Sequence, residues 1–188
     1  PMMKGLLDHM LARGINYFVP HAFSPVFPNP DCPPHFGAEG RDPQFSGFTR
    51  LMRYGNQMSH LLCGAEHAAD VAIVYHAELE WCNGAAGMFT QVPAQILYVR
   101  QIDFDILPFD ALAGARVEGE RLRVNRETYK ALIVPGCPAL PDTLIAMLKA
   151  LAQEGLPVWF VDERPRGADF GRVVPRERPA EEADGFAS

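Results

Sequence analysis

Short apolar runs alternate with segments of helical periodicity in the second half of this 188-residue chain. Residues 71–75, 131–134 and 157–161 are the apolar runs, and each predicts a buried strand. Residues 141–154 carry leucine and isoleucine at helical spacing and end at Gly155, a residue type that commonly follows helices. Strands that alternate with helices predict a parallel sheet with right-handed crossovers, which places this half in the α/β class.

Further elements fit the same pattern. We expect a helix near 90–101, a strand at 103–107 and a small hairpin at 117–124. Residues 164–188 are rich in proline, glycine and charged side chains and poor in apolar ones. This composition predicts loop or disorder for most of the tail.

The first part of the chain is organised differently. Residues 2–12 predict a helix, residues 15–19 a buried strand, and residues 46–62 a second helix that begins at a serine N-cap. A proline-rich loop, residues 20–46, separates the strand from the second helix. Loops of this length are usually functional or disordered, and the aromatic residues in this one argue against disorder.

The composition excludes some partners. The formal net charge is −6, whereas nucleic acids and anionic membranes require a basic face. No apolar run is long enough to span a bilayer. None of the four cysteines stands in a C-x-x-C pair, so we expect reduced thiols in a cytoplasmic protein and predict no metal or cofactor. The opening Pro1-Met2-Met3 suggests the middle of a longer chain.

The strongest candidate site follows the strand at 71–75, where His76, Glu78, Glu80 and Trp81 occur within six residues. Ligands of open α/β sheets gather at the carboxyl ends of strands. The tryptophan offers a stacking surface, and the histidine and carboxylates offer proton-transfer and acceptor groups. The alternative is a surface loop with a core tryptophan and solvated carboxylates. Alternate residues of an extended segment splay apart, so these two carboxylates are not expected to form a glycosidase pair.

Three more residues are candidates for substrate binding. His21 follows the predicted strand at 15–19, and His35 and Glu39 lie in the long loop. His21 could instead be a loop histidine bonded to a nearby carbonyl. For the loop, a structural role in which Arg41 and Asp42 hold it together is an equally good interpretation.

Two regions resemble known families. Residues 70–162 resemble the class I glutamine amidotransferase-like, flavodoxin-like fold, through the strand at 131–134 that runs into Pro135-Gly136 and through the strand Gly155-Leu156-Pro157-Val158-Trp159-Phe160-Val161. Residues 14–62 are similar to the last strand, loop and helix of a glycosidase (β/α)8 barrel. The segments that carry this likeness are Gly-Ile-Asn-Tyr-Phe-Val-Pro-His, His-Phe-Gly-Ala-Glu-Gly-Arg-Asp-Pro-Gln-Phe and Leu-Met-Arg-Tyr-Gly-Asn-Gln-Met-Ser-His-Leu-Leu.

Together the chain resembles the junction between barrel and amidotransferase-like domain in large bacterial glycoside hydrolases. Family 42 β-galactosidases share this layout, with a second domain called the trimerisation domain, and some rhamnosidase-like proteins look similar. The resemblance implies a barrel tail at 1–66, a flavodoxin-like parallel sheet flanked by helices at 67–165, and a loop or disordered tail at 166–188.

The resemblance also implies a function. The whole enzyme would hydrolyse O-glycosidic bonds with two carboxylates, both expected upstream of Pro1, so the fragment alone would be inactive. This piece would shape the pocket for a carbohydrate substrate, contact the rest of the barrel, or contribute to a homo-oligomer.

Two alternatives remain open. The chain could be a non-catalytic carbohydrate-binding or oligomerisation module. It could also be a cysteine-dependent hydrolase of the amidotransferase-like class, although the strand at 157–161 is followed by Asp162-Glu163 and not by a cysteine. Cys137 follows another strand, but the adjacent Pro138 has no N–H for an oxyanion hole, and no Cys-His-Glu triad is evident.

Overall fold

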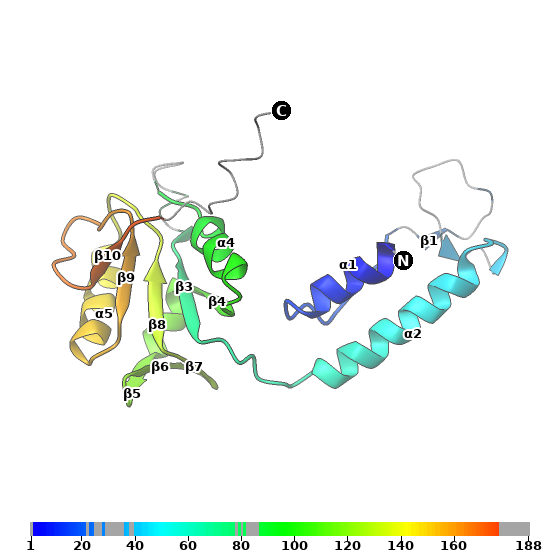
Figure 1. The fold of residues 1–188 in the computed structure, drawn as a ribbon, viewed down its shortest axis with the longest axis horizontal. Helices are drawn as coiled ribbons and strands as arrows, with labels where there is room; N and C mark the ends of the chain where they lie inside the picture. The colour runs from blue at the N-terminus through cyan, green and yellow to red at the C-terminus, as the bar shows by residue number, and fades with distance from the viewer. Residues whose placement is uncertain are drawn as a thin grey trace. The chain divides into compact units, whose positions relative to one another are not determined.

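The computed structural model describes residues 2–21, 23–24, 28, 36–37, 40–77, 79, 81 and 87–176. The chain divides into two compact units, Pro1–His67 and Ala68–Ser188, which are described separately (Figure 1). None of the described helices is long and apolar enough to cross a membrane.

The second unit is built on a five-stranded parallel sheet. Its strands are β3 (Val71–Tyr75), β4 (Phe104–Pro108), β8 (Ala131–Val134), β9 (Val158–Val161) and β10 (Arg172–Val174). Their order in the sheet is β10-β9-β8-β3-β4, and every neighbouring pair is parallel. The predicted α/β fold with a parallel sheet is therefore confirmed. The order is also the flavodoxin-like one, in which the first strand lies between the second and the third.

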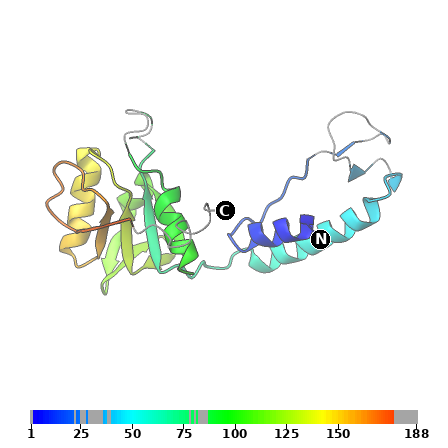
Figure 2. The ribbon, with the colours of Figure 1, turned by 45° about the horizontal axis from the view of Figure 1, so that its top comes forward.

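Both faces of the sheet are covered. Alternate residues of β3 belong to different hydrophobic clusters. Ala72 and Val74 lie in a large cluster that includes residues of α5 (Asp142–Gln153). Ile73 lies in a smaller cluster that includes residues of α4 (Gln91–Val99). Figures 1 and 2 show the strands between these two helices. Burial on both faces explains why the strands are continuous apolar runs without polar alternation.

Three short antiparallel strands are inserted between β4 and β8. A 3-10 helix (Phe109–Gly114) leads into β5 (Arg116–Glu118), β6 (Arg121–Val124) and β7 (Glu127–Tyr129). The predicted hairpin is confirmed, and both turn residues, Gly119 and Glu120, have the positive φ that tight hairpins favour. The third strand, β7, was not predicted from the sequence. Its Tyr129 hydroxyl donates to Asp105 Oδ2 at 3.0 Å and so ties the insertion to β4.

The strand β10 lies in the segment expected to be loop. It has only three residues, too few for a periodic pattern. Just before it, Gly171 has φ 69°, and a Cβ there would lie 2.8 Å from the carbonyl oxygen of Val158. A glycine at this position lets the chain approach β9 closely enough to add the edge strand. Residues 177–188 of the tail lie outside the described part.

The first unit contains two packed helices. They are α1 (Met2–Leu11) and α2 (Phe45–Leu62), accompanied by a two-residue parallel pair, β1 (Phe23–Ser24) and β2 (Phe36–Gly37). The helices lie side by side in both ribbon views (Figures 1 and 2). Leu7 of α1 packs on Gly55, and the Tyr54 hydroxyl donates to Asp8 Oδ1 at 2.7 Å.

Two predictions for this unit are wrong. Residues 15–19 form no strand in the described structure, and Tyr17 and Val19 are 84% and 80% exposed, because no strand of the described part pairs with them. The second helix does not begin at a serine cap. It begins at Phe45, and Asp42 Oδ1 instead accepts a hydrogen bond from the Gln44 backbone N–H at 2.7 Å.

Candidate functional site

The sheet topology marks one position where ligands are expected. From β3 the chain moves to one side to form β4 and then returns to the other side to form β8, β9 and β10. The switch point therefore lies between β3 and β8, and in open α/β sheets ligands bind outside the carboxyl ends of the strands at this point. His76 follows β3 directly, and Pro135-Gly136-Cys137 follows β8.

His76 is part of the protein interior. Its side chain is 1% exposed, and neither ring nitrogen has a hydrogen-bond partner among the described residues. Three side chains pack around Gly87: a Cβ there would lie 2.5 Å from Leu79 Cδ2, 3.4 Å from His76 Cε1 and 3.5 Å from Cys137 Cβ. The Met88 N–H also donates to the Gly136 carbonyl oxygen at 2.7 Å, which joins this segment to β8.

Cys137 lacks the properties of a nucleophile. It is fully buried, and burial, with a smaller contribution from the negative charge of Glu163, raises the pKa of its thiol to about 12. A reactive cysteine needs a stabilised thiolate and an accessible sulfur. This geometry argues against the cysteine-dependent hydrolase that the sequence left open.

A strained residue, Asp162, directly follows β9 (Val158–Val161). Asp162 has φ 65°, a backbone conformation that non-glycine residues seldom adopt. Its carboxylate is engaged: Oδ1 accepts the Arg176 backbone N–H at 2.6 Å, and Oδ2 lies 3.6 Å from Arg176 Nε. The turn is thus present without a free nucleophile. The sequence alone shows that an aspartate and not a cysteine follows this strand, but it does not indicate the positive φ of Asp162.

The close approach of two loops at this edge depends on glycine. A Cβ on Gly136 would collide with the carbonyl oxygen of Val161 and would lie 3.3 Å from Glu163 Cγ. The ends of β8 and β9 are therefore in direct contact, which brings Glu163 to the side of Cys137.

The structure separates the predicted residues after β3. Trp81 is 80% exposed, whereas His76 and Leu79 are buried, so His76 and Trp81 do not share a surface. The sequence analysis offered the alternative of a surface loop whose tryptophan is buried in the core. The exposed Trp81 does not fit that alternative. His76 is therefore no surface ligand in this arrangement, whereas the Trp81 side chain is open to solvent. Glu78 and Glu80 lie outside the described residues.

Of the candidates in the first unit, only His21 lies among the described residues. His21 is exposed, and His35 and Glu39 lie outside the described residues. Asp42 is buried and holds the start of α2, which supports the structural interpretation of that residue.

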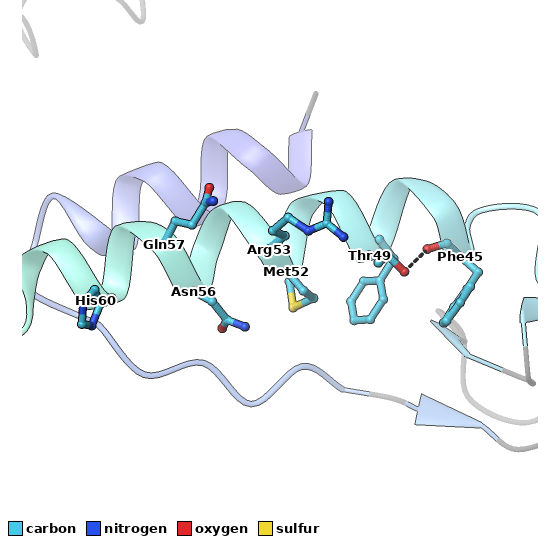
Figure 3. A pocket seen from close by; sticks show the side chains of 8 residues that line it. Phe45, Thr49, Met52, Arg53, Asn56, Gln57 and His60 are labelled. Carbon is cyan, nitrogen blue, oxygen red and sulfur yellow. Dashed lines mark hydrogen bonds between the residues drawn. The ribbon is translucent and has the colours of Figure 1, made fainter.

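A groove runs along one face of α2 (Figure 3). Its first half is largely apolar and its second half is polar. The lining residues are Phe45, Phe48, Thr49, Met52, Arg53, Asn56, Gln57 and His60. Gly55 is the buried residue of α2, and the apolar side chains of this helix are half-buried or exposed. The apolar side chains of this face recur at the helical spacing of a packing surface.

No three histidine, cysteine or acidic side chains converge on a metal-sized site in the described ranges. No protein-family model matches the sequence, and no curated protein matches it. The fold is similar to part of the structure of a rhamnosidase from Novosphingobium sp. PP1Y, with 19% identity and a TM-score of 0.56. The match covers 86% of this chain but 16% of the rhamnosidase chain, so this chain spans a small part of that protein's length.

Proposed function

We propose that this chain is part of a glycoside hydrolase and that it helps to form the carbohydrate-binding surface of that enzyme. The observation that carries the proposal is the fold likeness to a rhamnosidase over 86% of the chain, which includes residues of both units. The finer identity, whether β-galactosidase-like or rhamnosidase-like, depends on the residues around the sugar.

Within this proposal the chain binds sugar and does not cleave it. Among the described residues at the sheet edge, the thiol of Cys137 is buried and the carboxylate of Asp162 is engaged, so neither supplies an activated nucleophile. The two catalytic carboxylates would belong to the rest of the barrel. The exposed apolar side chains of residues 15–19 and the groove along α2 would then pack against that barrel.

Trp81 is the residue we assign to sugar contact. An exposed indole provides a flat apolar face on which the C–H groups of a pyranose can stack, with an N–H at its edge for a hydroxyl. Glu78 and Glu80 would bind further hydroxyl groups. The proposal places His76 in the framework that supports this loop.

The binding role can be tested by titrating the chain with L-rhamnose and with D-galactose while recording the indole N–H signals by NMR. We expect a saturable shift of the Trp81 signal, its loss in Trp81→Ala, and its retention in the control Trp159→Phe. No shift with either sugar, or a shift that persists in Trp81→Ala, would contradict the assignment. In parallel, we expect no turnover of nitrophenyl glycosides, and robust turnover would refute the missing-carboxylate argument.

A second candidate function, an oligomerisation module, is supported by exposed apolar side chains of the second unit. Tyr98 and Val99 at the end of α4 and Ile106 on the edge strand β4 are all exposed. Edge strands with apolar side chains are natural pairing surfaces. Light scattering of the chain would show a discrete oligomer that Ile106→Lys dissociates, whereas a monomer at all concentrations would argue against this function.

A further inference from the structure

The three-stranded insertion of the second unit has two chemically different faces. Successive side chains of a strand point to opposite faces, and the row that contains Leu122 and Tyr129 packs into the larger hydrophobic cluster. The next row, on the outer face, contains Arg116, Arg123 and Thr128. Two arginines therefore lie directly opposite each other on neighbouring strands, an arrangement in which like charges repel.

This outer face carries an excess of positive charge. We call it the arginine face, and its members are Arg116 and Glu118 of β5, Arg121 and Arg123 of β6, and Thr128 of β7. Arg116 Nε donates to Glu118 Oε1 at 2.6 Å, and Glu118 Oε2 lies 3.8 Å from Arg123 Nε. Arg121 lies opposite Glu118 in the register. Even with Glu120 of the hairpin turn, the arginines outnumber the carboxylates, on a chain whose formal net charge is −6.

The arginine face has donors to spare for an anion. The contacts with Glu118 involve Nε of Arg116 and of Arg123, whereas each guanidinium also carries two Nη groups. The side chains of Arg116 and Arg123 are 67% and 36% exposed, so a ligand can reach them. Arginine binds carboxylates through paired N–H groups. The face therefore fits a ligand that carries several carboxylate groups.

The surroundings favour a hydrated ligand over a protein or a lipid. Residues 116–130, all of which the structure describes, include no exposed large hydrophobic side chain. Protein interfaces and surfaces that insert into membranes usually centre on aromatic or aliphatic side chains. The negative charge of the whole chain also opposes the long-range attraction of a nucleic acid.

We infer that the arginine face binds an acidic polysaccharide through its carboxylate groups. The class of ligand rests on the proposed function in a glycoside hydrolase. The insertion joins the sheet at the amino ends of its strands, where the Lys130 N–H donates to the Asp70 carbonyl oxygen at 2.7 Å (Figure 1). The loop that contains Trp81 instead follows the carboxyl end of β3, so the arginine face is a second contact, separate from the one assigned to Trp81.

The test titrates the whole chain with polygalacturonate at low ionic strength and follows the backbone amide signals of residues 116–130 by NMR. We expect saturable shifts that added NaCl weakens, and none with neutral galactan. The double variant Arg116→Gln/Arg123→Gln should weaken binding by about tenfold or more, through lost charge-assisted hydrogen bonds. The matched control is Arg172→Gln, an exposed arginine of β10, which should leave binding unchanged.

Glu118→Gln should act in the opposite direction and tighten binding, because it removes the carboxylate that competes for Arg116 and Arg123. Circular dichroism checks that each variant is folded. Three results would overturn the inference: no binding of polygalacturonate, binding that survives the double substitution, or equally tight binding of poly-L-glutamate. Trp81→Ala should not affect this titration. If polygalacturonate binds while simple sugars leave the Trp81 signal unshifted, the Trp81 assignment fails and the arginine face stands.

Discussion

The two units bury their apolar residues to very different degrees. In the second unit β3 and β8 are buried along almost their whole length, and α5 contributes Leu144, Leu148 and Leu151 to the larger cluster. In the first unit α1 buries two leucines, and α2 buries one glycine over 18 residues. Helical periodicity is equally clear in both. The comparison teaches that a sequence pattern specifies an apolar face, while burial depends on what that face meets.

The largest difference between the two units should be in the reactivity of their thiols. Cys63 lies exposed at the end of α2, whereas Cys137 is fully buried and its pKa is raised from 9.0 to about 12. The shift alone lowers the thiolate fraction of Cys137 about a thousandfold near neutral pH, since each pKa unit is a factor of ten. We expect Ellman's reagent to modify Cys63 rapidly and Cys137 only after unfolding. Fast modification of Cys137 in the Cys63→Ser chain would show that the sheet edge is open.

Two leucine truncations compare the cores directly. Leu148 in α5 is 0% exposed, and Leu6 in α1 is 56% exposed. We expect Leu148→Ala to lower the free energy of unfolding by about 2–5 kcal/mol, through lost burial and a cavity. Leu6→Ala should change it by less than about 0.5 kcal/mol in the isolated chain. Urea denaturation followed by circular dichroism measures both, and equal losses would mean that the first unit has a core the burial pattern does not reveal.

Two glycine-to-alanine substitutions should change the free energy of unfolding in opposite directions. A Cβ at Gly136 collides with the Val161 carbonyl oxygen, whereas a Cβ at Gly47 in α2 meets nothing within 4 Å. We expect Gly136→Ala to destabilise the second unit by about 1–3 kcal/mol. Gly47→Ala should stabilise α2 by about 0.5–1 kcal/mol, because alanine loses less conformational freedom in a helix. The same denaturation experiment applies, and a neutral Gly136→Ala would show that the two loops can separate at little cost.

Sequence-based prediction succeeded for elements whose signal lies within their own residues. The strands at 71–75 and 131–134 and the hairpin turn at Gly119-Glu120 were predicted because apolar runs and turn residues are local signals. β10 was missed because three residues carry no period, and its pairing depends on the close approach at Gly171.

The candidate site was harder to predict, for a related reason. The sequence placed His76 and Trp81 on one loop, but it could not say that the histidine turns inward and the tryptophan outward. The proximity of His76 to Cys137, 61 positions later in the chain, arises only when β8 takes its place beside β3. The prediction of a strand at residues 15–19 was wrong because the pattern is local, whereas a strand also needs a neighbour to pair with. No strand of the described chain supplies that neighbour.

The smallest expected effect concerns surface ion pairs, one in each unit. Asp8 accepts hydrogen bonds from Lys4 and Tyr54, and these lower the pKa of its carboxyl, while Lys149 lowers that of Asp169. A lowered pKa means that the stabilisation is complete above the ordinary carboxyl pKa and is lost as the pH falls through the lowered value. We expect Asp8→Asn to loosen α1 from α2 slightly near neutral pH, measured as faster hydrogen exchange of α1 amides, and to remove part of the acid sensitivity of this contact. Asp169→Asn should leave α1 unchanged. If Asp8→Asn has no effect on α1 exchange, the two helices are held together by packing such as that of Leu7 on Gly55, without a measurable contribution from this carboxylate.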